Sequence, residues 1–114
     1  MNLSDHQVET IRAWAECNPY ISQVRLFGSR AKGTARPDSD ADIAVTIVGT
    51  EGETPFAIFV GGKGEWEERL SVITGLRVRL GLYDLQSSPE IICYCQHSSE
   101  LLYERTSGYL ASRD

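Results

Sequence analysis

Two apolar runs on either side of a polar segment constrain this chain most. Residues 21–27 read ISQVRLF and residues 41–48 read ADIAVTIV. Both runs predict β-strands, and the second is expected to be well buried because it is rich in β-branched residues. The polar segment between them, residues 28–40, contains glycine and proline and therefore opposes a long helix. Gly28-Ser29 follows the first run at once, so we expect a tight turn or a short helix to begin there.

Two further segments have the apolar spacing of amphipathic helices. Residues 3–17 place apolar side chains on one helical face after Ser4, which is a suitable N-cap, and residues 65–74 do so before Gly75. Residues 76–82 alternate apolar and other side chains, which predicts a half-buried strand.

The remaining segments are less decided. Residues 56–60, FAIFV, fit a helix and an edge strand equally well, and residues 90–110 are expected to be helical over part of their length. The order of elements predicts an α/β (α+β) fold, with a small mixed β-sheet and helices packed on one face. We expect one domain over residues 1–114, with the other face of the sheet free for a site.

Composition and charge exclude several classes of protein. A formal net charge of -5 opposes a surface for nucleic-acid phosphates. We found no apolar run of membrane-spanning length and no signal pattern at the N-terminus, so we expect a cytoplasmic protein that does not act at a membrane. Cys17, Cys93 and Cys95 lack the spacing of redox or zinc motifs and are expected to be reduced thiols.

Asp40 and Asp42 are candidate metal ligands at the start of the second strand. Residues two apart in a strand point to the same side, so the two carboxylates are expected to project together. Carboxylate oxygens are ligands that Mg²⁺ prefers, usually with substrate phosphates and water completing the shell.

The other end of the polar segment is suited to phosphate. A turn at Gly28 lets a phosphate approach the backbone closely, and Ser29 can offer its hydroxyl at the start of a helix. Arg30, Lys32 and Arg36 supply positive charge in an otherwise acidic chain, and the sequence does not decide which of them points inward.

Residues 28–45, GSRAKGTARPDSDADIAV, resemble the signature of the minimal nucleotidyltransferases in the DNA polymerase β superfamily. That signature is Gly-Ser, ten residues, and then Asp-x-Asp. The resemblance implies that Gly28 and Ser29 contact the phosphates of a nucleoside triphosphate. It also implies that Asp40 and Asp42 bind two magnesium ions while a hydroxyl attacks the α-phosphorus and pyrophosphate leaves.

The resemblance also implies a partner. Minimal nucleotidyltransferases are often paired with HEPN-domain toxins, and the antitoxin transfers AMP from ATP to a tyrosine of the toxin. We therefore expect ATP as the donor and a HEPN-domain protein as the acceptor. Related larger enzymes modify small molecules such as aminoglycosides. The length of 114 residues argues against this activity here.

The sequence departs from the family pattern at the third carboxylate, which a later strand usually supplies. Its place falls on Gly81 or on Arg79, depending on the alignment, and neither can act as a metal-binding base. Asp84 falls on the core side of that strand unless a bulge at Gly81 shifts the register. General-base catalysis is typically worth about a hundred- to ten-thousand-fold in rate. A catalytically impaired nucleotide- or partner-binding module is therefore the alternative function.

Several other conspicuous residues have simpler interpretations. Asp38 follows a proline and is expected to belong to a turn rather than to a metal site. His6 and His97 are expected to be solvated, and Trp14 and Trp66 to pack against the sheet rather than stack on a base.

Overall fold

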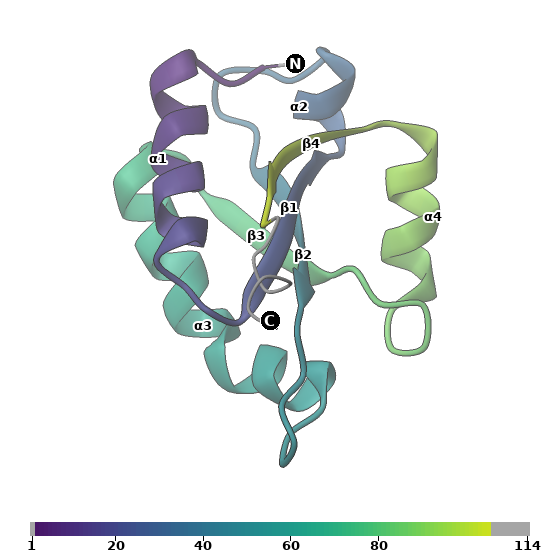
Figure 1. Ribbon diagram of the computed structural model, residues 1–114. Coiled ribbons are helices and arrows are strands. Elements are labelled where there is room, and N and C mark those ends of the chain that lie inside the picture. The colour runs from purple at the N-terminus through teal and green to yellow at the C-terminus, as the bar shows by residue number, and fades with distance from the viewer. Residues whose placement is uncertain (1, 106–114) are drawn as a thin grey trace.

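The computed structural model describes residues 2–105 as a four-stranded sheet with helices on both sides (Figure 1). The elements in chain order are α1 (Asp5–Glu16), β1 (Ile21–Phe27), α2 (Ser29–Lys32), β2 (Ala41–Ile47), α3 (Pro55–Thr74), β3 (Val78–Leu82), α4 (Pro89–His97) and β4 (Ser99–Glu104). The sheet order is β3-β2-β1-β4, with β1 antiparallel to both neighbours and β2 parallel to β3. The expected α+β fold with a small mixed sheet is confirmed. In the described part of the chain, no helix combines the length and apolarity needed to cross a membrane.

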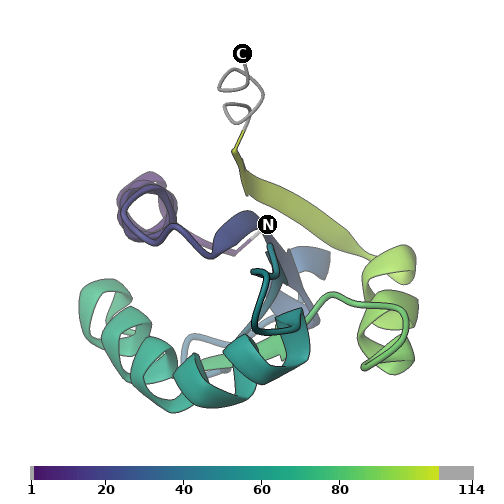
Figure 2. The same cartoon turned by 60° about the horizontal axis from the view of Figure 1, so that its bottom comes forward.

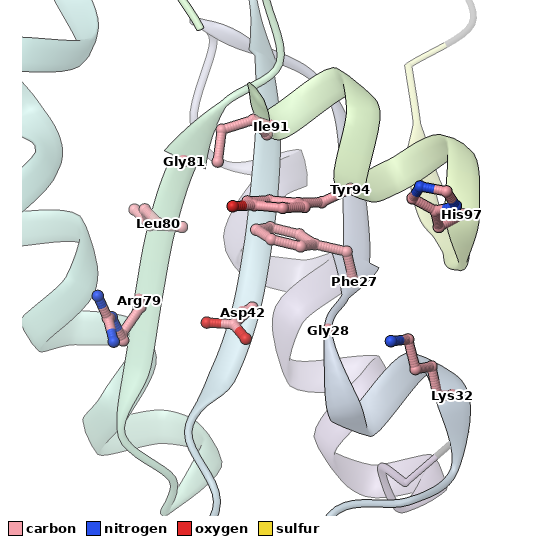
Figure 3. A pocket seen from close by; sticks show the side chains of 10 residues that line it. All are labelled: Phe27, Gly28, Lys32, Asp42, Arg79, Leu80, Gly81, Ile91, Tyr94 and His97. Atoms are coloured by element: carbon pink, nitrogen blue, oxygen red, sulfur yellow. The ribbon is translucent and has the colours of Figure 1, made fainter. Parts of the chain in front are cut away.

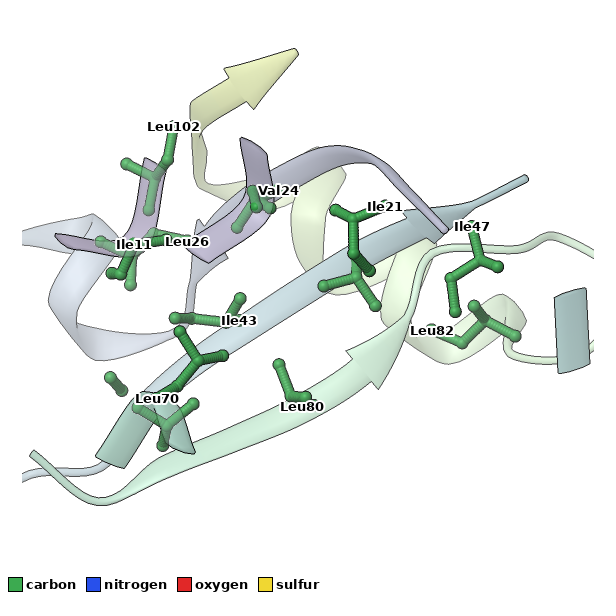
Figure 4. Packing of buried hydrophobic residues seen from close by; sticks show 14 of the residues in the cluster. Ile11, Ile21, Val24, Leu26, Ile43, Ile47, Leu70, Leu80, Leu82 and Leu102 are labelled. Atoms are coloured by element: carbon green, nitrogen blue, oxygen red, sulfur yellow. The ribbon is translucent and has the colours of Figure 1, made fainter. Parts of the chain in front are cut away.

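The two faces of the sheet are covered unequally. Helices α1 and α3 pack on one face, and α4 lies on the other (Figures 1 and 2). The main core fills the space under α1 and α3, where Ile11, Leu26, Ile43 and Leu70 are fully buried (Figure 4). The face of the sheet that we expected to be free for a site is therefore covered in part by α4 and carries a cavity beside it.

Helix α3 runs without a break through the glycine-rich residues 61–64, so of the two alternatives for residues 56–60 the helix is the one found. Glycine in a helix costs about 1 kcal/mol relative to alanine. At Gly62 the absence of a side chain makes room for Trp66, because a Cβ there would lie 2.6 Å from the Trp66 ring. The indole lies over this glycine and meets Trp14 edge-on, with ring centroids 6.2 Å apart. Both tryptophans pack against the hydrophobic core, as expected.

The segment 90–110 is helical in part, as expected, but it also contributes strand β4. Residues 106–110 lie outside the described residues. Two arginines attach β4 and its end to α1. Arg12 Nε donates to the carbonyl of Leu102 at 2.7 Å, and the Arg105 guanidinium donates to carbonyls at the end of α1. These partners are distant in sequence, which explains why local pattern did not predict the strand.

Helix α3 also closes the outer edge of β3. The backbone N–H of Val78 donates to Ser71 Oγ at 3.0 Å, and that of Leu80 donates to Glu67 Oε2 at 2.8 Å. Unpaired N–H groups at a sheet edge can pair with another chain, and here side chains occupy two of them.

The buried face of α3 makes a direct prediction about stability. Leu70→Ala should lower the free energy of unfolding by about 2 to 5 kcal/mol, because it leaves a cavity in the core. Val72 lies two residues away with 73% of its surface exposed, and Val72→Ala should change the free energy by less than about 0.5 kcal/mol. Urea denaturation followed by circular dichroism measures both, and equal losses would show that α3 packs through a different face.

Candidate active site

A cavity of about 430 Å³ lies between the sheet and α4 (Figure 3). Its lining has a polar end and an apolar end. The polar end carries Gly28, Lys32, Asp42 and Arg79, and the apolar end carries Phe27, Leu80, Gly81, Ile91 and Tyr94, with His97 at the end of α4 also on the wall. The cavity therefore suits a ligand that is charged at one end and flat or apolar at the other.

The register of β1 and β2 places Gly28 against Asp42. Phe27 pairs with Asp42 across the two strands, so the residue after Phe27 passes directly over the carboxylate. A Cβ at Gly28 would collide with Asp42 Oδ2, and the φ angle of 76° is itself one that glycine adopts most readily. The glycine is needed for both reasons.

Asp40 lies beside the cavity rather than on its wall. Its Oδ1 is 3.7 Å from Arg77 Nε, and its Oδ2 is 3.7 Å from Arg79 Nη1. Burial raises the pKa of Asp42, the Arg79 guanidinium lowers it, and the negative charge of Asp40 raises it further. The two carboxylates are therefore close enough to affect each other's charge.

Arg30 does not reach the cavity, although we expected it to contact phosphate. It is only 6% exposed, and its guanidinium donates to the carbonyls of Asn2 at 2.9 Å, Ser39 at 2.9 Å and Pro37 at 3.1 Å. These donors are occupied by the loop before β2. Arg30 holds that loop in place, and its assignment to phosphate is not retained.

The single turn α2 separates the other two residues expected at phosphate. Lys32 is exposed and lines the cavity, so its ammonium group is available to an anion there. Ser29 begins the turn next to Gly28 but does not line the cavity. The backbone carbonyl of Ser29 accepts from Thr34 N–H at 3.0 Å, which helps to end the turn.

Of the two residues on which the third carboxylate could fall, Arg79 is the one beside Asp42. In the parallel register of β2 and β3, Asp42 pairs with Arg79, and Ala44 pairs with Gly81. Asp84 lies beyond the strand, where its Oδ2 accepts from the Ser87 N–H at 3.0 Å in a turn. Asp84 therefore stabilises a turn.

Asp40 and Asp42 could together ligate a divalent cation, because their carboxylates lie close enough to interact electrostatically. Within residues 2–105, no group of three or more His, Cys, Asp or Glu side chains is placed to hold a metal ion. Asp42 lies on β2, and Asp40 directly precedes the first residue of that strand. Asp38 is exposed in a turn, as the sequence predicted, and His6 is exposed on α1.

The aromatic contact at the apolar end of the cavity was not foreseen from the sequence. Tyr94 of α4 stacks on Phe27 of β1 with ring centroids 6.4 Å apart and planes 13° from parallel. Tyr94 remains more than half exposed. Gly81 gives α4 room, because a Cβ there would lie 2.8 Å from Ile91 Cδ1. These contacts join segments that are far apart in sequence, so no local pattern could have revealed them.

Comparison with known proteins defines the class. A family model described as "Polymerase beta, Nucleotidyltransferase" matches residues 9–107. The chain belongs to this nucleotidyltransferase family. A search of curated proteins found no match.

Solved structures give the same fold. One described as "Crystal structure of the toxin-antitoxin with AMP-PNP" superposes with a TM-score of 0.63 at 24% identity, covering 88% of this chain and 74% of that one. Two mutants of the toxin–antitoxin MntA-HpeT superpose with TM-scores of 0.59 each, at 22% and 24% identity. They cover 88% and 86% of this chain, and 74% and 72% of theirs.

Substitutions of Arg30 and Lys32 should have different effects, the first on the stability of the fold and the second on ligand binding in the cavity. Arg30→Met removes the buried guanidinium and leaves carbonyls unpaired, so the free energy of unfolding should fall by roughly 2 to 4 kcal/mol. Lys32→Met changes an exposed side chain and should leave stability within about 0.5 kcal/mol while weakening the binding of an anion in the cavity. Urea denaturation and calorimetric titration of both variants check this, and a stable Arg30→Met variant would refute the structural role.

Asp42 should lower stability at neutral pH. Because its pKa is raised in the folded state, the folded protein binds a proton more readily than the unfolded chain, and stability falls as pH rises above the ordinary value of 3.8. Asp42→Asn should raise the melting temperature at pH 7 by roughly 1 to 3 °C, a gain that disappears at low pH. Calorimetry at pH 7 and pH 4 measures the difference, with Asp38→Asn as the exposed control. A lower melting temperature for Asp42→Asn at pH 7 would contradict the sign.

Proposed function

We propose that this protein transfers AMP from ATP to a hydroxyl group of a HEPN-domain partner, as the antitoxin of a toxin–antitoxin pair. The observation that carries the proposal is the meeting of Asp42, Gly28 and Lys32 at the polar end of one cavity. A carboxylate for a cation, a backbone open to close approach and an ammonium group are the groups that a triphosphate requires.

The shape of the cavity suggests how ATP lies in it. The triphosphate would occupy the polar end, over Gly28 and near Lys32. The base would occupy the apolar end, where Tyr94 presents a half-exposed ring already stacked on Phe27. Stacking on an aromatic ring is worth about 1 to 3 kcal/mol per base and tolerates different bases.

Asp40 and Asp42 would hold Mg²⁺ on their side of β2. When bound, the ion neutralises charge on the phosphates and polarises the α-phosphorus. In the transfer, the hydroxyl oxygen forms a bond to the α-phosphorus, and the bond to pyrophosphate breaks. The proton of the attacking hydroxyl needs a base, and Asp42 is the carboxylate that lines the cavity.

The structural neighbours support a protein partner. They are described as toxin–antitoxin structures, one with AMP-PNP and one carrying two aspartate-to-glutamate changes two positions apart. Asp40 and Asp42 have the same separation in this chain. We propose the cytoplasm as the compartment, because the reaction consumes a nucleoside triphosphate.

A second candidate is a module that binds nucleotide or partner without transferring AMP. The observation that favours it is the presence of Arg79, in place of a third carboxylate, next to Asp42. The two candidates differ in whether AMP moves from ATP to the partner.

Transfer is tested with ATP labelled at the α-phosphate, the purified protein, Mg²⁺ and a candidate HEPN-domain protein. We expect the partner to acquire label from α-labelled ATP and none from γ-labelled ATP. Asp42→Asn should reduce labelling by about a hundredfold or more, as loss of a catalytic base does. Asp38→Asn, an exposed change in the same segment, should retain it. Calorimetric binding of ATP without any labelling would favour the binding module, and equal labelling by the Asp42→Asn variant would refute the enzyme.

A further inference from the structure

Arg79 lies beside Asp40 and Asp42, the proposed metal ligands, at one of the two positions on which the family's third carboxylate falls in alignment with this sequence. We propose that the site works with one divalent cation and that the Arg79 guanidinium is the second positive group, placed against the triphosphate. The proposal rests on the proposed function, because it assumes that ATP occupies the cavity.

The backbone fixes where Arg79 lies. Strand β3 pairs in parallel with β2, and Arg79 is the direct partner of Asp42. Side chains on neighbouring strands at paired positions share a face, and Arg79 lines the same cavity as Asp42 and Lys32 (Figure 3). Arg77 shares that parity but does not line the cavity.

The side chain of Arg79 is free to change partner. It is 69% exposed, and its ion pair with Asp40 spans 3.7 Å. A cation bound to Asp40 would compete with Arg79 for the same carboxylate. The displaced guanidinium would then lie beside the polar end of the cavity, where its planar donors match phosphate oxygens in a bidentate manner.

Charge balance supports the exchange. In a two-metal site, three carboxylates and two divalent ions carry a net charge of plus one. Here Asp40, Asp42, one divalent ion and Arg79 carry the same net charge. A second ion next to Arg79 would add positive charge without a carboxylate to hold it, since no third acidic ligand is in place within residues 2–105.

The decisive measurement counts ions. The probe is Mn²⁺ with α,β-methylene-ATP, whose α–β bridge cannot be cleaved by transfer, and the bound Mn²⁺ per protein–nucleotide complex is determined by electron paramagnetic resonance. We expect one Mn²⁺ in the unaltered protein and two in Arg79→Asp, which supplies the missing carboxylate. Two ions in the unaltered protein, or one in Arg79→Asp, would overturn the proposal.

A matched pair of variants tests the contact with phosphate. Arg79→Gln should weaken Mn²⁺-dependent binding of α,β-methylene-ATP by about tenfold, the effect of one charge-assisted hydrogen bond. Arg77→Gln removes an ion pair with Asp40 of the same length, from a side chain 80% exposed, and should change affinity less than about twofold. Equal effects of the two variants would overturn the role of Arg79. Failure of the unaltered protein to bind the nucleotide at all would instead overturn the proposed function.

Discussion

The antiparallel pairing of β1 with β2 is the constraint on which the site depends. Its register sets Phe27 opposite Asp42, so the chain must leave β1 directly over a carboxylate, and only a glycine fits there. The loop between the two strands then has to return over a fixed distance. Arg30 keeps it in one shape by bonding to several of its carbonyls from inside. The Gly-Ser turn and the aspartates are thus held together by backbone pairing and one buried guanidinium.

The resulting site brings positive and negative side chains close together. The chain carries a net charge of -5, yet Arg77 and Arg79 lie beside Asp40, and Lys32 lines the same cavity as Asp42. Such a cluster can attract a polyphosphate locally without a basic surface elsewhere, because exposed charges are screened beyond about 10 Å in ordinary salt. It also explains how Asp42 is tolerated in a partly buried position, since the neighbouring guanidinium opposes the effect of burial on its pKa.

Local pattern predicted the elements whose stability comes from nearby residues. Ser4 and Gln7 form the capping box that starts α1, and the alternation of Val78, Leu80 and Leu82 toward the core was readable directly. Prediction was incomplete where distant contacts decide the outcome. The glycines of α3 oppose a helix locally, whereas the packing that offsets this cost involves Trp14 of another helix. Strand β4 forms because β1 offers it an edge.

The sequence by itself determined the central strands, the Gly-Ser and Asp-x-Asp spacing between them, and the absence of a carboxylate at either aligned third position. These follow from residue type and separation along one short segment. Only the tertiary structure decided that Arg30 turns inward while Lys32 faces the cavity, and that Arg79 rather than Gly81 is the partner of Asp42. The physical reason is that a side chain's role depends on strand register and on which carbonyls or cavities lie within its reach. Both are set by pairing between segments that are far apart in the sequence.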